Sequence, residues 1–182
     1  MTSDEALMLQ FQQGSGEAFT ELFRRYREPI YGFFRRRLQD PARAEELAQE
    51  AFLAILKSAQ RYEPRALFRT YLYGIALKIV WAERRKSTRR SGFSGSSSDG
   101  REANEMPDPA TLADPDAGLV VRDAVGRLDA QEREILLLRE YEQLSYEEIA
   151  AVMRVPVNTV RSRLFRARMA LRDVLLAQRP QA

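Results

Sequence analysis

With 182 residues and a net charge of +3, the chain has room for one or two small domains, and its total charge does not identify a nucleic-acid-binding protein. It contains no cysteine and no histidine, which excludes disulfide bonds, thiolate metal sites and histidine-based acid–base catalysis. No apolar run approaches the ~18 residues of a membrane span and the N-terminus does not resemble a signal peptide, so we expect a cytoplasmic protein without membrane insertion.

Residues 1–86 show the apolar periodicity of an all-helical domain. The expected helices are a short one from Thr2 or Ser3 to Gly14, a second from about Glu17, a third capped by Asp40 and Pro41, and a fourth from about Leu67 into Arg85. The side chains predicted to face the core are Phe19, Leu22, Phe23, Tyr26, Ile30, Phe33, Phe34, Leu38, Ala44, Leu47, Ala48, Ala51, Phe52, Ile55, Leu56, Phe68, Leu72, Ile75, Ala76 and Ile79.

The third and fourth helices each carry residues that this core does not explain. On the third, Glu46, Gln49, Glu50 and Leu53 share the face opposite the core positions. A leucine flanked by acids indicates either a docking surface for a basic, partly apolar partner or an ordinary solvated face. On the fourth, Tyr71, Tyr73, Leu77 and Trp81 lie outside the core stripe. That helix is therefore either buried on most sides or presents rings to a partner.

Residues 87–118 have a different composition, rich in Ser, Gly, Pro, Asp and Glu and poor in apolar side chains. From Ser91 to Gly118 there are six acids and one arginine. This composition predicts a flexible acidic linker between a first domain, residues 1–86, and a second helical domain, residues 119–182.

Within the second domain, Leu144 to Arg168 predicts two short helices joined by a tight turn. Ser145 and Glu148 form a capping box, and Pro156 suits the first turn of the second helix. On that helix Val160, Leu164, Ala167 and Leu171 share one side.

The opposite side of the second helix gathers Asn158, Arg161, Ser162, Phe165 and Arg166. A helix that buries one face and presents arginine, hydroxyl, amide and ring on the other suits the DNA major groove. The alternative is a solvated basic helix in a small bundle. The separation of the two faces and the helix-turn-helix spacing favour DNA recognition.

Three segments together resemble the extracytoplasmic-function (ECF) sigma factors, the compact two-domain class of the sigma-70 family of bacterial initiation factors. RAEELAQEAF at 43–52 resembles the polymerase-binding stretch, and FRTYLYGIALKIVWAERRK at 68–86 resembles the promoter-melting helix. LDAQEREILLLREYEQLSYEEIAAVMRVPVNTVRSRLFRARMAL at 128–171 resembles the domain that reads the upstream promoter element.

The resemblance implies two small helical domains without catalytic chemistry, metal, cofactor or small-molecule substrate. Its implied partners are bacterial core RNA polymerase, promoter DNA and an anti-sigma factor. Polymerase binding would fall to Glu46, Gln49, Glu50 and Leu53. Reading of the upstream (−35) element would fall to Asn158, Thr159, Arg161, Ser162, Arg163, Phe165, Arg166 and Arg168, with Arg163 and Arg168 on phosphates. Binding and melting of the downstream (−10) element would fall to Tyr62, Arg65, Phe68, Arg69, Tyr71 and Lys78. Phe68 is equally well explained as a core residue.

Several positions depart from the family pattern. Tyr71 replaces the usual Trp of the melting helix, and Lys78 replaces an Asn. Asn158 stands where the family often has glycine. In the helix-turn-helix, Arg154 replaces a glycine, and a left-handed arginine there would cost roughly 1 kcal/mol.

Two other functions are weighed against a sigma factor. A stand-alone regulator would use only the C-terminal helix-turn-helix and would bind its operator without polymerase. An enzyme is disfavoured, because a helical di-metal site uses Glu-x-x-His pairs and the chain has no histidine. The adjacent pairs Glu45/Glu46 and Glu147/Glu148 diverge around a helix rather than converging on one ligand.

Overall fold

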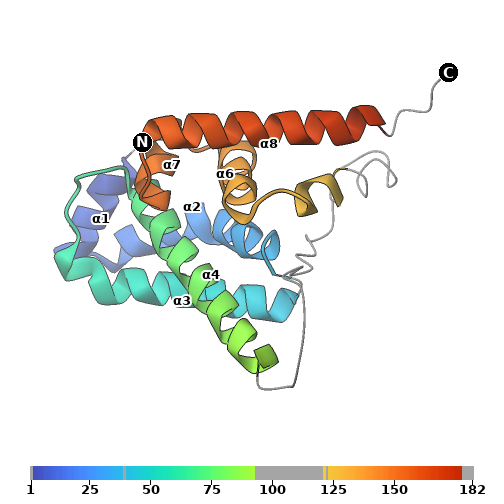
Figure 1. Ribbon diagram of the computed structural model, residues 1–182. Helices are drawn as coiled ribbons and strands as arrows, with labels where there is room; N and C mark the ends of the chain where they lie inside the picture. Colours follow the sequence, from blue (N-terminus) through green and yellow to red (C-terminus); the bar gives the residue numbers. More distant parts are fainter. Residues whose placement is uncertain (1, 39, 93–120, 122, 178–182) are drawn as a thin grey trace. The chain divides into compact units, whose positions relative to one another are not determined.

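The computed structural model describes residues 2–38, 40–92, 121 and 123–177, and these residues form helices and turns, with no strand among them (Figure 1). The chain divides into two compact units, Met1–Glu102 and Ala103–Ala182. The predicted all-helical fold of two small domains is therefore confirmed.

The first unit contains α1 (Asp4–Gln12), α2 (Gly16–Arg35), α3 (Pro41–Ser58), the 3₁₀ turn η1 (Ala59–Arg61) and α4 (Phe68–Gly92). Local capping explains where the first three begin. The side chains of Ser3, Ser15 and Asp40 accept hydrogen bonds from first-turn N–H groups at 3.2, 3.3 and 2.9 Å. Gly14, with φ of +103°, supplies the left-handed turn between α1 and α2.

Most of the predicted core positions of this unit are buried, including Leu22, Phe33, Phe34, Leu47 and Ile55. Two predicted core residues, Phe23 and Leu56, are instead exposed. The Phe23 ring still packs edge-on against Phe52 at 4.8 Å, so it is covered on one side only.

Helix α4 is buried on several sides: of its residues outside the predicted stripe, Tyr73 and Leu77 are buried, whereas Tyr71 and Trp81 are half-buried. It contacts α1, α2 and α3, and therefore buries Tyr73, Leu77 and Val80 as well as Phe68 and Leu72. The predicted core residues Ile75 and Ile79 are only half-buried.

Helix α4 also continues to Gly92, six residues beyond Lys86, where we expected the first domain to end. Arg and Lys are good helix formers, and cations near a helix C-terminus interact favourably with the helix dipole. The basic run after Glu83 therefore extends the helix.

Residues 93–118 of the predicted linker lie outside the described residues, and the proposed domain limits stay predictions.

The second unit contains a helical turn at 123–126, then α6 (Ala130–Glu140), α7 (Tyr146–Met153) and α8 (Val157–Ala177). Both α6 and α7 pack against α8 (Figure 1). The capping box is present: the Ser145 hydroxyl accepts from the Glu148 N–H at 3.1 Å, and the Glu148 carboxylate accepts from the Ser145 N–H at 2.8 Å. Arg154 adopts the expected left-handed conformation, with φ of +56°.

Candidate nucleic-acid interface

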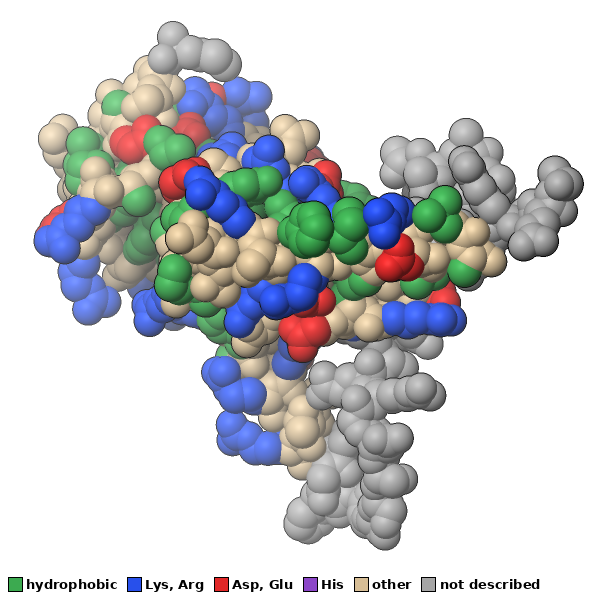
Figure 2. Space-filling model, turned by 45° about the horizontal axis from the view of Figure 1, so that its top comes forward, with side chains coloured by type: hydrophobic (Ala, Val, Ile, Leu, Met, Phe, Trp, Pro, Cys, Tyr) green, Lys and Arg blue, Asp and Glu red, His purple; other side chains and the backbone are tan. Residues whose placement is uncertain are grey.

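Helix α8 separates its two faces largely as its sequence predicts, although Leu171 of the predicted buried side is only half-buried. Val160, Leu164 and Ala167 are buried against the rest of the second unit. Asn158, Arg161, Ser162 and Arg166 are exposed, and Phe165 is 64% exposed. Basic and hydrophobic side chains lie close together along the exposed side of α8 (Figure 2). An exposed ring between arginines contributes nothing to this core and is available to a partner.

The side chains of this face are held by short-range contacts. Arg161 donates to the Asn158 side chain at 3.4 Å, and the Ser162 hydroxyl donates to the Thr159 carbonyl at 3.1 Å. Thr159 and Arg163 are half-buried, so only part of each side chain faces solvent.

Two arginines of α8 form ion pairs with acids of α6. Nε of Arg166 lies 2.7 Å from the Glu132 carboxylate, and Nη2 of Arg168 lies 2.7 Å from the Glu140 carboxylate. Both arginines remain about half exposed.

All eight residues predicted for the upstream element lie on α8, and six of them are exposed.

Pro156 lies one position earlier than predicted. It precedes α8, and its carbonyl accepts from the N–H groups of Thr159 and Val160 at 2.9 and 3.2 Å. Pro156 therefore occupies the cap position rather than the first turn. Proline tolerates both positions, since neither requires its missing N–H.

The residues predicted to bind the downstream element divide into two groups. Tyr62 and Phe68 are only 5% and 1% exposed, so they cannot stack on a base in this conformation. Arg65 and Lys78 are exposed, and Arg69 and Tyr71 are half-buried. Tyr62 and Phe68 lie in an aromatic cluster with Tyr26 and Tyr71, at centroid distances of 5.2–6.2 Å. Phe68 is thus a core residue of this structure, and the contacts of both rings with DNA stay predictions.

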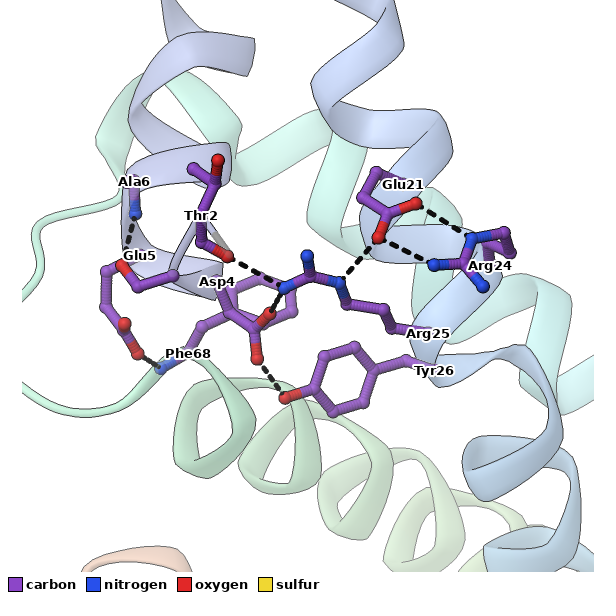
Figure 3. Close-up of polar contacts among 10 residues, drawn as sticks. Thr2, Asp4, Glu5, Ala6, Glu21, Arg24, Arg25, Tyr26 and Phe68 are labelled. Atoms are coloured by element: carbon purple, nitrogen blue, oxygen red, sulfur yellow. Dashed lines mark hydrogen bonds and ion pairs between the residues drawn. The ribbon is translucent and has the colours of Figure 1, made fainter.

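Helix α1 holds this cluster in place (Figure 3). The Glu5 carboxylate accepts a hydrogen bond from the N–H of Phe68 at 2.8 Å, and Asp4 accepts from the Tyr26 hydroxyl at 2.5 Å and from Arg25 at 2.6 Å. Nε2 of Gln12 donates to the carbonyls of Ala59 and Tyr62 at 2.6 and 2.7 Å. Both ends of the 59–68 segment are thus attached to α1.

The electrostatics of this region follow from burial and ion pairing. Burial raises the pKa of Tyr62 to about 12, and burial together with the Asp4 hydrogen bond raises the pKa of Tyr26. Hydrogen bonds from Arg24 and then Arg25 lower the pKa of Glu21 to about 2. Both tyrosines are therefore neutral and Glu21 is charged at neutral pH.

The acidic face of α3 is exposed as its sequence predicts. Glu46, Gln49 and Glu50 are exposed, and Leu53 is 51% exposed. Arg43 lies beside this face and joins two helices: Nη1 pairs with Glu46 at 2.6 Å, while Nε and Nη2 pair with Glu83 of α4 at 2.9 and 2.7 Å. These contacts raise the pKa of Arg43, the Glu83 hydrogen bonds being the larger cause.

Sequence reasoning missed several residues of these surfaces. Leu67, just before α4, is exposed beside Arg65, and a periodic pattern could not have found it because it lies in a loop. Glu5, Gln12 and Glu132 were missed because each acts on a segment far away in the sequence. Exposed Phe23 and Leu56 extend the apolar surface near Leu53.

The described part of the chain contains no cluster of three or more acidic, histidine or cysteine side chains suited to a metal ion. Among its helices, none combines the length and hydrophobicity that a transmembrane span requires.

Two segments of the chain match known family descriptions. Residues 22–90 match "Sigma-70 region 2", and residues 119–171 match "Sigma-70, region 4". The chain belongs to the sigma-70 family. The two matches fall in the same order as the three motifs read from the sequence, and this sigma factor carries its α3 and α4 surfaces in the first match and α8 in the second.

Curated relatives place this sigma factor in the ECF class. The RNA polymerase sigma-H factor of Pseudomonas aeruginosa is 34% identical over 181 residues, covering 94% of this chain and 93% of the relative. The ECF RNA polymerase sigma-E factor of Escherichia coli K12 is 30% identical over 177 residues, covering 93% and 92%. The chain is an RNA polymerase sigma factor of the ECF type. Such proteins are transcription initiation factors rather than enzymes.

Solved structures share the fold. CnrH, solved with the cytosolic domain of CnrY, has a TM-score of 0.71 at 23% identity, covering 97% of this chain and 99% of that chain. RpoE from Bartonella quintana, solved with the anti-sigma factor NepR, has a TM-score of 0.72 at 23% identity, covering 88% and 98%.

Proposed function

We propose that this sigma factor binds bacterial core RNA polymerase in the cytoplasm, reads two promoter elements with its two domains and helps to open the DNA. The observation that carries this proposal is the exposed face of α8, where arginines, an amide, a hydroxyl and the Phe165 ring lie opposite the buried Val160, Leu164 and Ala167. A face of this composition has a physical use in the major groove and none in the core.

Upstream recognition falls to Arg161, Ser162, Phe165 and Arg166, with Asn158 at the beginning of the helix. Arginine pairs with the O6 and N7 of guanine through two N–H groups, and an aromatic ring contacts the thymine methyl. Arg163 and Arg168 lie at the border of the face and contact phosphates, which positions the helix without reading sequence. The backbone carbonyl of Thr159 accepts a hydrogen bond from the Ser162 hydroxyl, so Thr159 contributes by positioning that hydroxyl.

Downstream recognition falls to the side chains around the aromatic cluster that reach solvent, Arg65, Leu67, Arg69 and Tyr71, and to the exposed Lys78 about two turns further along α4. Basic side chains attract the single-strand backbone, and the Tyr71 ring offers a stacking surface for an unpaired base. Tyr62 and Phe68 lie buried in this cluster and support it. Their packing, together with the α1 contacts, fixes the surface on which the unpaired base rests.

Polymerase binding falls to the α3 face of Glu46, Gln49, Glu50 and Leu53. Its acidic residues surround an exposed leucine, so it suits a basic partner with an apolar centre. Glu46 also pairs with Arg43, and Arg43 pairs with Glu83 of α4. These ion pairs hold the α3 face in a fixed position relative to α4, the proposed melting helix.

An anti-sigma factor is the second partner that we propose. Structurally similar RpoE was solved with the anti-sigma factor NepR, and CnrH with the cytosolic domain of CnrY. The α3 face, with the apolar side chains of Phe23 and Leu56 nearby, is a surface for which polymerase and such an inhibitor would compete.

In vitro transcription with purified core polymerase tests the proposal. The full-length chain should direct initiation at a defined set of start sites from a genomic library, and it should bind duplex promoter weakly when polymerase is absent. A chain that fails to bind core polymerase, yet binds one duplex operator tightly alone, would instead be a stand-alone helix-turn-helix regulator.

A further inference from the structure

One acidic side chain of α6 lies against the DNA-facing residues of α8. Glu132 is in the first turn of α6, and its carboxylate accepts a hydrogen bond from Nε of Arg166 at 2.7 Å. The Glu132 side chain is only 16% exposed, whereas that of Arg166 is 59% exposed. The less mobile, more buried partner therefore restrains the exposed one.

The backbone that carries Glu132 is itself firmly held. The next residue, Arg133, is buried, and its guanidinium donates to the carbonyls of Val125, Gly126 and Leu128 at 3.0, 2.6 and 2.9 Å. These bonds attach the first turn of α6 to the end of the preceding helical turn. Glu132 therefore projects from a fixed point toward α8.

The hydrogen bond to Glu132 uses the Nε side of Arg166, so other N–H groups of its guanidinium can still pair with a base. Guanidinium is a planar group with five N–H donors, and pairing with the edge of guanine uses two of them in parallel. When Glu132 engages the Nε side, the plane and direction of the group are restricted before DNA arrives. Pre-ordering a flexible side chain reduces the entropy that binding must overcome.

We infer that Glu132 is a positioning residue for promoter recognition: it orients Arg166 so that Arg166 reads one base pair of the upstream element. The inference rests on the proposed function of α8. Arg166 contacts the DNA, and Glu132 acts only through Arg166.

The same two helices provide a matched control. Arg168 of α8 pairs with Glu140 of α6 at the same distance of 2.7 Å, but through Nη2, and both partners are about half exposed. Arg168 is assigned to phosphate, a contact that carries no base information. Removing Glu140 deletes an ion pair of the same length between the same two helices without touching a base-reading side chain.

The test compares full-length wild type, Glu132→Ala, Glu132→Gln and Glu140→Ala, each assembled with core polymerase. Each holoenzyme selects from duplex promoters in which only the upstream element is randomised, and sequencing gives the preference at every base pair. For Glu132→Ala we expect the preference at one base pair to fall by about fivefold, part of the discrimination of a bidentate pair. Glu132→Gln should retain most of it, since its amide oxygen still accepts from Nε. Glu140→Ala should leave every base preference unchanged.

Arg166→Ala locates the base pair, and a double variant tests the route. If Glu132 acts through Arg166, Glu132→Ala should change no preference in the Arg166→Ala background. A uniform loss of binding to all sequences, with a lower melting temperature, would show that Glu132 only stabilises the fold and would overturn the inference.

The inference is also overturned if Glu132→Ala keeps the wild-type preference while Arg166→Ala loses it. It is overturned equally if Arg166→Ala leaves every base preference unchanged, because Arg166 then reads no base pair and Glu132 has no base contact to position. Both outcomes leave the proposed function intact. Failure of the wild-type holoenzyme to select any upstream sequence would instead contradict the proposed function.

Discussion

The carboxylate of Glu5, in the first turn of α1, accepts a hydrogen bond from the backbone N–H of Phe68, the first residue of α4, at 2.8 Å. The first N–H groups of a helix have no partner within that helix, and a carboxylate there is further favoured by the helix dipole. Helix α4 therefore receives its N-terminal cap from another helix, and α1 fixes the position at which α4 begins.

Glu5→Ala should lower the free energy of unfolding by about 1 kcal/mol, the usual cost of losing a cap, while Glu5→Gln should lower it less because the amide oxygen still accepts. Urea unfolding of the full chain measures the difference. Glu28→Ala is the control, because Glu28 is exposed on α2 and pairs with neighbouring Arg27. If Glu5→Ala and Glu28→Ala are equally stable, Glu5 is not a cap for α4.

Tyr62 should tolerate phenylalanine and not alanine. Its buried hydroxyl has no hydrogen-bond partner in the described structure, whereas its ring packs against Phe68 and Tyr71. Tyr62→Phe should leave the stability unchanged or raise it by up to about 1 kcal/mol, and Tyr62→Ala should cost about 3–5 kcal/mol. Equal losses in both variants, measured by thermal unfolding, would contradict this assignment of the ring to the core.

The same tyrosine predicts a dependence of stability on alkaline pH. Burial raises the pKa of Tyr62 from 10.0 in the unfolded chain to about 12 in the fold, so the folded state disfavours the phenolate. Its contribution is fully present below pH 10.0 and is lost as the pH rises toward about 12. Unfolding free energies measured across that interval should fall more steeply for wild type than for Tyr62→Phe; parallel curves would show that another group is responsible.

Arg154→Gly should stabilise the helix-turn-helix by about 1 kcal/mol, because glycine reaches the left-handed region without the Cβ clash of arginine. The matched control is Ala151→Gly in the exposed part of α7, where glycine should destabilise by about 1 kcal/mol. Denaturant unfolding of both variants gives the two signs. A loss of stability in Arg154→Gly would mean that the arginine side chain makes a contact worth more than the strain.

Arg161→Ala should reduce promoter discrimination by roughly 1–3 kcal/mol at one or two upstream base pairs. Arg172→Ala is the control: this exposed arginine lies three turns further along α8 and pairs with adjacent Asp173. Start-site mapping with each holoenzyme on promoter variants compares the two. Identical base preferences in wild type and Arg161→Ala would remove Arg161 from direct readout.

Glu50→Lys should weaken the affinity for core polymerase by about tenfold or more, since a like charge would then face a basic partner. Glu50 is chosen over Glu46 because Glu46 shares Arg43 with Glu83, so changing it would also disturb the α3–α4 contact. Glu45→Lys, an equal charge change just outside this face of α3, should have a much smaller effect. A competition assay with labelled polymerase measures both, and equal losses would indicate only a general charge effect.

The amino-acid sequence by itself determined the features that depend on nearby residues. Helix beginnings follow from caps such as Ser3, Asp40 and Ser145, whose side chains reach N–H groups two or three positions away. The exposed faces of α3 and α8 follow from periodicity, and so does most of the buried stripe opposite each. The left-handed Arg154 follows from the helix-turn-helix motif.

Only the tertiary structure decided which rings are covered and which side chains are oriented from a distance. Periodicity gives one apolar side of α4, but contacts with three neighbouring helices bury other sides as well, so Tyr73 and Leu77 are buried although they lie outside the predicted stripe. The Glu5–Phe68 and Glu132–Arg166 contacts join residues 63 and 34 positions apart. Such pairs depend on the angles and registers at which helices pack, which no local pattern along the chain encodes.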